Sequence, residues 1–257
     1  MGSSFAKLAA IDFAIQGSGF LLANLFQTEK FYDLTGSLTF VVVALQSLLW
    51  AKRRATTRQK VQTALVCTWA ARLGLFLFFR VLRVGKDSRF DKIKTNPWKF
   101  LVAWTLQGVW VLVTLAPSLI LNSKSNDTPL QNRDYFGWIL WTFGFLLESI
   151  ADHQKNTFKM DPANKGKWIN KGLWSISQHP NYLGEILLWI GHLIPATSVF
   201  DTPFDYISVG SPLFIAFLLI RVSGINMQDR QGLKRWGADA AYQEYIRSTA
   251  KLIPYIW

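Results

Sequence analysis

Long apolar runs, separated by short polar segments, make up most of the chain. Averaged over a window of about 19 residues, this pattern predicts seven membrane-spanning helices. Most of them approach the roughly 20 residues needed to cross the hydrocarbon layer. The fifth and the seventh are shorter, so we expect both to continue as helices into the flanking polar residues. The predicted spans are Leu8–Phe26, Tyr32–Ala51, Val61–Leu82, Trp98–Leu121, Tyr135–Ile150, Tyr182–Phe200 and Tyr206–Arg221.

The composition agrees with an all-α membrane protein. Of the 257 residues, 50% are hydrophobic and 17% are charged, whereas an ordinary soluble domain carries roughly a quarter charged residues. A chain this apolar does not remain disordered. Its single cysteine, Cys67, excludes a disulfide framework. Asp12 and Gln16 interrupt the first span, which we therefore interpret as a retained helix and not as a cleaved signal peptide.

The basic residues predict an orientation. The formal net charge is +12, and the 28 Lys and Arg residues lie mainly between the apolar runs. When residues near the span ends are counted with the adjacent polar segment, nineteen fall on one side of the predicted spans and eight on the other, and Arg72 lies well inside a span. The richer side is expected to be cytosolic, which places the N-terminus outside or in the lumen and the C-terminus in the cytosol. This distribution fits contact with membrane lipids and argues against a nucleic-acid partner.

No polar segment is long enough to fold alone, so the sequence predicts a single transmembrane domain over residues 1–257. The last thirty residues mix aromatic and charged positions and predict one amphipathic helix on the cytosolic membrane face. Nothing in the sequence selects among the bacterial inner membrane, the endoplasmic reticulum and an organelle membrane.

The densest polar set runs from the end of the fifth predicted span to the middle of the sixth. It contains ESIADHQKNTFK (148–159) and HPNYLGE (179–185). Pro180 is expected in the first turn of a helix, where its missing N–H needs no partner. The free N–H groups of such a turn favour an anion, and four lysines precede it. These are Lys159, Lys165, Lys167 and Lys171.

Four residues at the start of the sixth predicted span and within it share one helical face. Asn181, Glu185, Trp189 and His192 follow one another at intervals of four, four and three. Glu185 lies about one turn inside the apolar segment, where a carboxylate facing lipid would be costly, so we expect it to face a cavity or a partner. Gly184 allows close approach of a ring or of a neighbouring helix.

Structural roles are the alternative for several of these residues. Asp152 and Lys159 could be an ordinary interfacial acid and base, His179 could simply begin a helix, and His192 could hydrogen-bond a neighbouring helix. Asp12 in the first span is expected to pair internally. The sequence contains no HExxH motif, no paired-cysteine metal signature and no nucleotide P-loop, and its three histidines have no recognisable metal-ligand spacing, so we predict no metal site.

Four segments together resemble the steroid 5-alpha-reductase superfamily, and above all its broad membrane branch. They are QHPNYLGEILLW (178–189), the preceding ESIADHQKNTFK, and the C-terminal stretches RVSGINMQDRQGLKRWG and AYQEYIRSTAKLIP. The resemblance covers about residues 60–257. It implies a seven-helix oxidoreductase of lipid metabolism, acting on CH–CH groups, that reduces a C=C double bond with NADPH bound from the cytosolic side.

The resemblance also implies which residues surround the cofactor. Matched position by position, they are Arg83, Asp152, Lys159, Lys167, Asn181, Glu185, Trp189 and Arg221. Glu185 is the expected catalytic residue. The sequence departs from the better-known steroid reductases in the substrate half, because the stretch TGSLTFVVVALQSLLW (35–50) of the second predicted span contains no acid and the third span contains no tyrosine. The expected substrate is therefore a hydrophobic unsaturated, steroid- or lipid-like molecule.

Two other functions stay open. Membrane methyltransferases that use S-adenosylmethionine share the pattern H-P-x-Y-x-G, which His179–Gly184 repeats. The missing acid and tyrosine also fit a non-enzymatic structural subunit of a membrane complex. Asp152, the lysines and the glutamate directly after Gly184 favour the reductase.

Overall fold

The computed structural model describes residues 2–51, 54–125 and 128–256. Lys52 and Arg53, two of the charges used to predict the orientation, lie outside the described residues, as do Asn126 and Asp127. Over the described ranges the regular secondary structure is helical, apart from one isolated β-bridge. The helices form two compact units, the first comprising residues 1–130 and 196–211 and the second residues 131–195 and 212–257. The expectation of a single domain stays a prediction.

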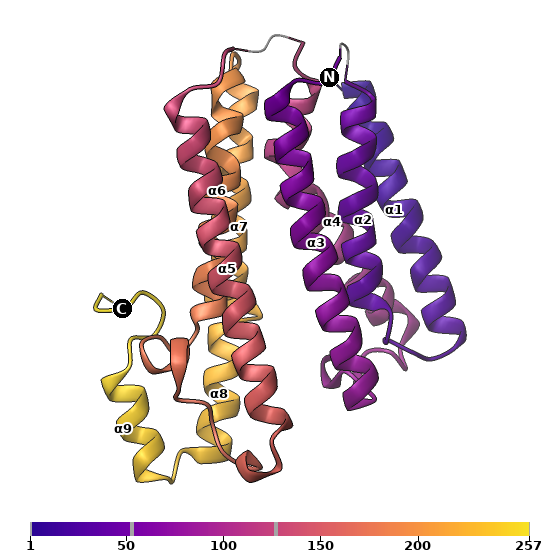
Figure 1. Cartoon of the computed structure of the whole chain (residues 1–257). Helices are drawn as coiled ribbons and strands as arrows, with labels where there is room; N and C mark the ends of the chain where they lie inside the picture. Colours follow the sequence, from indigo (N-terminus) through magenta and orange to yellow (C-terminus); the bar gives the residue numbers. More distant parts are fainter. Residues whose placement is uncertain (1, 52–53, 126–127, 257) are drawn as a thin grey trace. The chain divides into compact units, whose positions relative to one another are not determined.

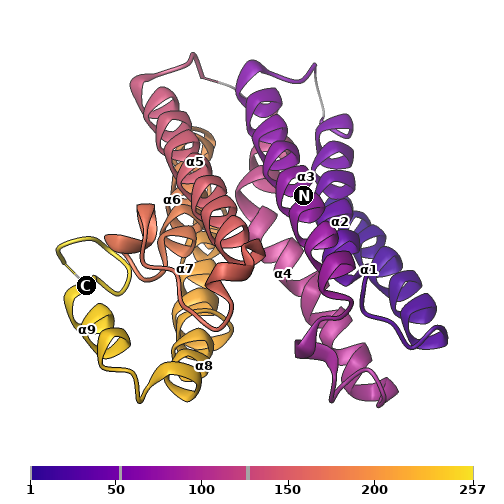
Figure 2. The same cartoon turned by 60° about the horizontal axis from the view of Figure 1, so that its bottom comes forward.

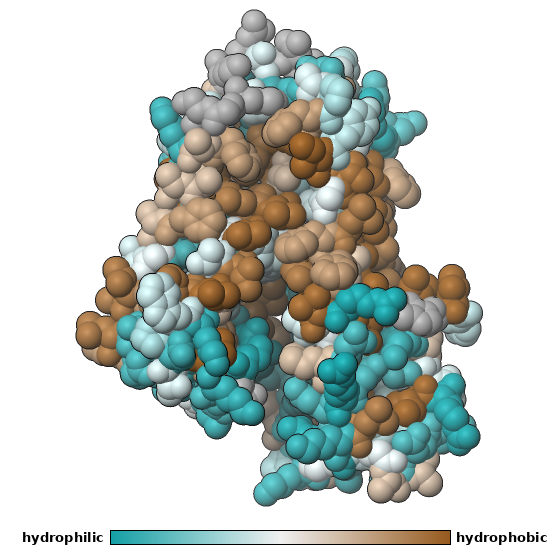
Figure 3. Space-filling view, turned by 180° about the vertical axis from the view of Figure 1, so that it is seen from behind, coloured by the Kyte–Doolittle hydropathy of each residue, from teal (hydrophilic) through white to brown (hydrophobic). Residues whose placement is uncertain are grey.

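Six helices among the described residues are long and apolar enough to cross a membrane. In Figure 3, hydrophobic residues cover the middle of each unit. Hydrophilic residues gather at the end of each unit that lies at the bottom of this view. The chain is therefore a multi-pass integral membrane protein. The six candidate spans are Ser4–Leu25, Tyr32–Leu49, Thr57–Val84, Pro97–Ser123, Pro180–Val199 and Pro203–Trp236.

The first unit is an up-and-down bundle of four helices (Figure 1). Local sequence sets the helix ends: Thr56 and Gln59 form a reciprocal capping box, Asn96 caps the fourth helix, and Gly85 ends the third with a φ of +88°. The helices are α1 (Gly2–Leu25), α2 (Tyr32–Leu49), α3 (Thr57–Val84) and α4 (Pro97–Ser123). The turn η1 (Ser88–Phe90) joins α3 to α4.

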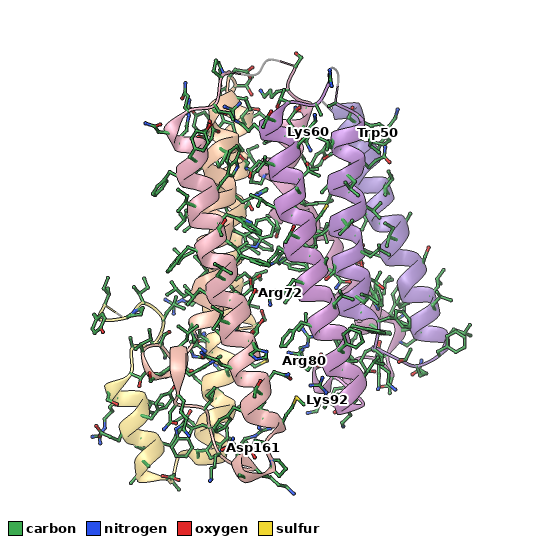
Figure 4. The ribbon with its side chains drawn as sticks, viewed as in Figure 1. Trp50, Lys60, Arg72, Arg80, Lys92 and Asp161 are labelled. Carbon is green, nitrogen blue, oxygen red and sulfur yellow. The ribbon has the colours of Figure 1, made fainter. Side chains whose placement is uncertain are left out.

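Buried polar residues connect the helices of this bundle. The amide nitrogen of Gln16 donates to the Asp12 carboxylate at 3.4 Å and to the Thr39 hydroxyl at 3.1 Å. All three side chains are buried, which confirms that Asp12 pairs internally. Lys60, Arg72 and Arg80 are distributed along α3 in Figure 4, with Arg72 near its middle.

Ion pairs tie the loops at both ends of the first unit. At one end Lys94 contacts Glu29 at 2.8 Å. At the other, Lys124 pairs with Asp201 and Asp205, which holds the 3₁₀ turns η4 (Thr197–Val199) and η5 (Pro203–Val209) against the end of α4.

The second unit contains the remaining helices, α5 (Asn132–Met160), α6 (Pro180–Ala196), α7 (Gly210–Phe217), α8 (Ile225–Trp236) and α9 (Ala240–Ser248). The fifth predicted span does extend into its polar flanks, as α5. Helix α6 begins at Pro180, as expected. The seventh predicted span is not one regular helix, because a π-helical turn at Leu218–Val222 follows α7. The short turns η2 (Pro162–Asn164) and η3 (Gly172–Ser175) lie between α5 and α6.

The prediction of one C-terminal helix was wrong. Helix α8 ends at Trp236, Gly237 follows, and Asp239 caps a separate helix α9 by accepting from the Ala241 N–H at 2.8 Å. After α9 the chain turns back and pairs with the segment before α6, through the bridge between Ser177 and Ala250. Figures 1 and 2 both show this return of the tail. Gly237 and the capping residue Asp239 therefore divide the predicted helix into α8 and α9.

Helices α5 and α6 touch through glycines, backbone to backbone. A Cβ atom placed on Gly144 would lie 2.5 Å from the Gly184 carbonyl oxygen, and one on Gly191 would lie 2.5 Å from the Trp141 nitrogen. Small residues permit such close crossings of membrane helices. Gly184 thus admits a neighbouring helix, one of the two expectations for it.

Candidate functional site

Asp152 and Asn181 meet where the end of α5 lies beside the start of α6. The Asn181 amide nitrogen donates to the Asp152 carboxylate at 3.1 Å, and Asp152 is 9% exposed. A carboxylate accepts but does not donate, so this bond fixes which end of the amide faces Asp152. The Asn181 oxygen then points elsewhere; it is buried and accepts no hydrogen bond from the described residues. Two of the sequence-predicted residues therefore form a pair with a buried acceptor.

Glu185 and Trp189 continue from Asn181 along α6. Each follows the previous one by four residues within one α-helix, so they share a face. Glu185 is half-buried and Trp189 is 1% exposed. The Trp189 ring meets the buried His192 ring edge-on, with centroids 5.3 Å apart. The predicted face is thus present, and it becomes more buried from Asn181 and Glu185 to Trp189 and His192.

The predicted basic residues lie at exposed positions. Lys159 is in the last turn of α5, Lys167 lies in the connection between α5 and α6, and Arg221 lies in the π-helical turn before α8. All three belong to the second unit, as Asp152 and Asn181 do. Arg83 is in the last turn of α3 and belongs to the first unit, so the structure does not join it to the others.

The connection between α5 and α6 is fixed by specific contacts. The Trp174 indole N–H donates to the Ala151 carbonyl at 3.0 Å, and the Lys155 ammonium lies 4.4 Å from the centre of the Trp174 ring. The Tyr245 hydroxyl donates to the Trp174 carbonyl at 2.8 Å. Trp174 therefore links α5 with α9 directly beside the Asp152–Asn181 pair.

A second polar group, which the sequence did not predict, surrounds His179. Its Nε2 lies 3.0 Å from one oxygen of Asp229, and Lys251 contacts the other oxygen at 2.8 Å. Burial lowers the pKa of His179; Asp229 opposes this shift, while Lys155 and Lys251 add to it. Because a carboxylate only accepts, the Nε2–H group of His179 donates to Asp229. The QHPNY segment was visible in the sequence, but its partner lies 50 residues away on α8.

The C-terminal tail completes this region. The Gln178 amide nitrogen donates to the carbonyls of Ile246 and Thr249, at 3.0 and 2.6 Å, and the Ser177 hydroxyl donates to the Leu252 carbonyl at 2.8 Å. Beside these contacts lies an open cleft of about 730 Å³. Its lining includes Gln178, Asp229, Tyr242, Arg247, Lys251 and Tyr255.

Comparison with known proteins places the chain in a family. The family model described as "Protein of unknown function (DUF1295)" matches residues 19–249. A delta(14)-sterol reductase from Candida albicans is 30% identical over 197 residues, which are 70% of this chain and 40% of the relative. A delta(14)-sterol reductase from Mus musculus is 25% identical over 133 residues, covering 46% of this chain and 30% of the relative.

Another relative has a different name. A probable O-methyltransferase from Ustilaginoidea virens is 32% identical over 123 residues, 42% of each chain. The chain spans less than half the length of these three curated relatives, and no solved structure matches it. Since the family model covers far more than half of the sequence, the chain belongs to the DUF1295 family and is distantly related to the delta(14)-sterol reductases.

Proposed function

We propose that this protein is a membrane-embedded reductase that uses NADPH to saturate a carbon–carbon double bond in a hydrophobic, steroid- or lipid-like substrate. When bound, the cofactor supplies a hydride to one carbon, and the other carbon takes a proton from an acid or from water. The Asn181–Asp152 pair is the observation that carries the proposal. The distant similarity to sterol reductases supports the same reaction class.

The donor and acceptor pattern of this pair suits a nicotinamide nucleotide. Asp152 holds the Asn181 amide so that its buried oxygen is available to accept, and a carboxamide or ribose hydroxyl of the cofactor would donate to it. Glu185, one turn deeper, is an acceptor for the same carboxamide. Trp189 and the apolar residues around it exclude water at the deeper end.

Basic residues supply the charge that the phosphates need. Lys159, Lys167 and Arg221 are exposed in the second unit, where they would neutralise a phosphorylated cofactor approaching from water. Exposed contacts of this kind are screened by salt. Arg83, in the other unit, is part of the proposal through its match to the family pattern alone.

The proposed enzyme spans the membrane seven times. In addition to the six apolar helices, we assign α5 as a span: its 29 residues correspond to about 43 Å at 1.5 Å per residue, and its backbone crosses α6 closely. The Lys and Arg distribution puts the N-terminus outside and the C-terminus in the cytosol, so the cofactor enters from the cytosol.

A methyltransferase is the second candidate, favoured by the similarity to a probable O-methyltransferase. Both candidates would use the segment around His179, but they need different cosubstrates. Binding therefore separates them before any lipid substrate is identified.

The test measures nucleotide binding to the purified full-length protein in detergent, through energy transfer from tryptophan to NADPH. The wild type should bind NADPH, whereas Asn181→Ala, which removes the oriented amide, should bind up to roughly tenfold more weakly, as expected for the loss of about one neutral hydrogen bond. Asp152→Asn can still accept from Asn181 and should bind better than Asp152→Ala. His153→Gln, at an exposed position beside Asp152, is the matched control.

The same preparation is titrated with S-adenosylmethionine. Binding of S-adenosylmethionine without NADPH binding would replace the reductase by the methyltransferase. No binding of either cosubstrate would favour the structural subunit. If NADPH binds, a panel of unsaturated lipids that includes a delta(14)-unsaturated sterol tests turnover.

A further inference from the structure

A basic hollow, distinct from the Asp152–Asn181 pair, lies where the last apolar helix gives way to α8. It has a volume of about 360 Å³ and is lined by Arg221, Val222, Asn226, Met227, Arg230, Gln231 and Lys234. Three of these seven residues are cations, and none is a carboxylate. All belong to the second unit.

The charge of this hollow is not compensated by the acid closest in sequence. Asp229 precedes Arg230, but its two carboxylate oxygens contact His179 and Lys251. Arg221, Arg230 and Lys234 are exposed, and within the described ranges no ion pair involves their side chains. Three like charges around one hollow repel each other and favour an anion between them.

An exposed apolar strip leads to this hollow. Leu213, Phe217 and Val222 are 65%, 56% and 53% exposed. Leu213 and Phe217 are four residues apart, and Phe217 and Val222 are five residues apart. The second spacing fits the π-helical turn at Leu218–Val222, because the hydrogen bonds of a π-helix join residues i and i+5. Val222 belongs both to this strip and to the lining of the hollow, so the apolar surface is continuous with the basic one.

We infer that the hollow binds the phosphate of an anionic phospholipid, with the acyl chains along Leu213, Phe217 and Val222. A phospholipid matches this arrangement, because its apolar acyl chains are followed by an anionic phosphate at the membrane surface. Basic residues next to the cytosolic end of a membrane helix attract anionic lipids. The nucleotide phosphates offer similar chemistry, but a free nucleotide has no apolar part to cover the exposed strip.

The test compares phosphatidylglycerol with phosphatidylcholine as added lipid, measured by the thermal stabilisation of the full-length protein in a neutral detergent. The test variant is Arg230→Gln/Lys234→Gln, which leaves Arg221 unchanged because the proposed cofactor site includes it. The charge-matched control is Lys165→Gln/Arg235→Gln, at two exposed positions that do not line the hollow.

Phosphatidylglycerol, but not phosphatidylcholine, should stabilise the wild type and the control. Because each cation near the surface contributes about 1 kcal/mol to anionic-lipid binding, the test variant should need roughly 10- to 30-fold more phosphatidylglycerol. Equal weakening in the test variant and the control would mean that net charge alone acts, and would overturn the site. An unchanged test variant would overturn it as well.

Parallel titrations with NADPH and with inorganic phosphate distinguish the two phosphate sources. The lipid site predicts that NADPH binding in the test variant is unchanged, because Arg230 and Lys234 are not part of the proposed cofactor site. Weaker NADPH binding in the test variant would assign the hollow to the cofactor and reject the lipid. A protein that binds phosphatidylglycerol at this hollow and never binds NADPH would refute the proposed reductase and keep the lipid site.

Discussion

Gly144 and Gly184 face each other where α5 crosses α6, with no room for a side chain between the two backbones. A Cβ atom on Gly184 would lie 2.5 Å from the Glu148 nitrogen and 2.6 Å from the Gly144 carbonyl oxygen. Backbone atoms cannot rotate away as the end of a flexible side chain can. The crossing brings Asp152 beside Asn181, so the geometry of the candidate site depends on these two glycines.

Gly184→Ala should therefore separate the helices and destabilise the second unit. Overpacking of this kind costs about 1–3 kcal/mol, which a thermal unfolding measurement in detergent detects as a lower Tm. NADPH affinity should fall as well. Gly17→Ala, on α1 with no atom within 4 Å of the added Cβ, is the control and should leave Tm unchanged or raise it slightly. Equal stability of Gly184→Ala and the wild type would show that the α5–α6 contact is looser than described.

Glu185→Gln separates two roles for the glutamate. The amide keeps the size of the side chain and one acceptor oxygen but loses the titratable proton. If Glu185 only orients the cofactor, NADPH affinity and turnover should stay within a few-fold of the wild type. If it also relays a proton, kcat should fall by roughly 10²–10⁴-fold while NADPH affinity is retained. A variant with full activity and with an unchanged pH profile would assign Glu185 to helix packing.

The stability of the second unit should depend on pH through His179. Burial lowers the pKa of His179 in the fold below its ordinary value of 6.5, so the unfolded chain binds the proton more readily. The contribution of neutral His179 to the free energy of unfolding is thus complete above about pH 6.5. It is lost as the pH falls from 6.5 through the lower pKa that His179 has in the folded protein. Thermal unfolding between pH 7.5 and 5 should show the decrease.

The control for this pH effect is a second histidine. His179→Gln should have a lower Tm than the wild type at pH 7.5. Its Tm should then decrease less between pH 7.5 and 5, because glutamine does not titrate. His153→Gln, at an exposed position on α5, should keep the wild-type pH dependence. An identical dependence in wild type and His179→Gln would assign the effect to other groups.

Cysteine labelling tests the predicted orientation. In a Cys67→Ala background, Ser125→Cys should react with an impermeant maleimide in intact cells or sealed vesicles of native orientation. Ser248→Cys, on α9, should react only after permeabilisation. Both serines are exposed. Labelling of both cysteines from the same side would refute an odd number of spans between them.

The sequence alone predicted features that depend on neighbouring residues along the chain. The apolar runs identified the membrane helices, Pro180 marked the start of α6, and periodicity placed Asn181, Glu185 and Trp189 on one face. These features follow from hydrogen bonding within a helix and from local propensity, which a window of a few turns contains. The family pattern added Asp152, and its partner Asn181 is 29 residues away.

The tertiary structure decided which helices lie next to each other, and with that the partners of the polar groups. Gly137 and Gly144 on α5, and Gly184 and Gly191 on α6, are each seven residues apart; this matched spacing was a visible signal for the crossing. The pairs of His179 with Asp229 and of Gln178 with the C-terminal tail had no such signal. They depend on Gly237 and Asp239 breaking the last helix and on the direction that the chain takes afterwards, because a hydrogen bond between distant residues forms only where packing brings donor and acceptor together.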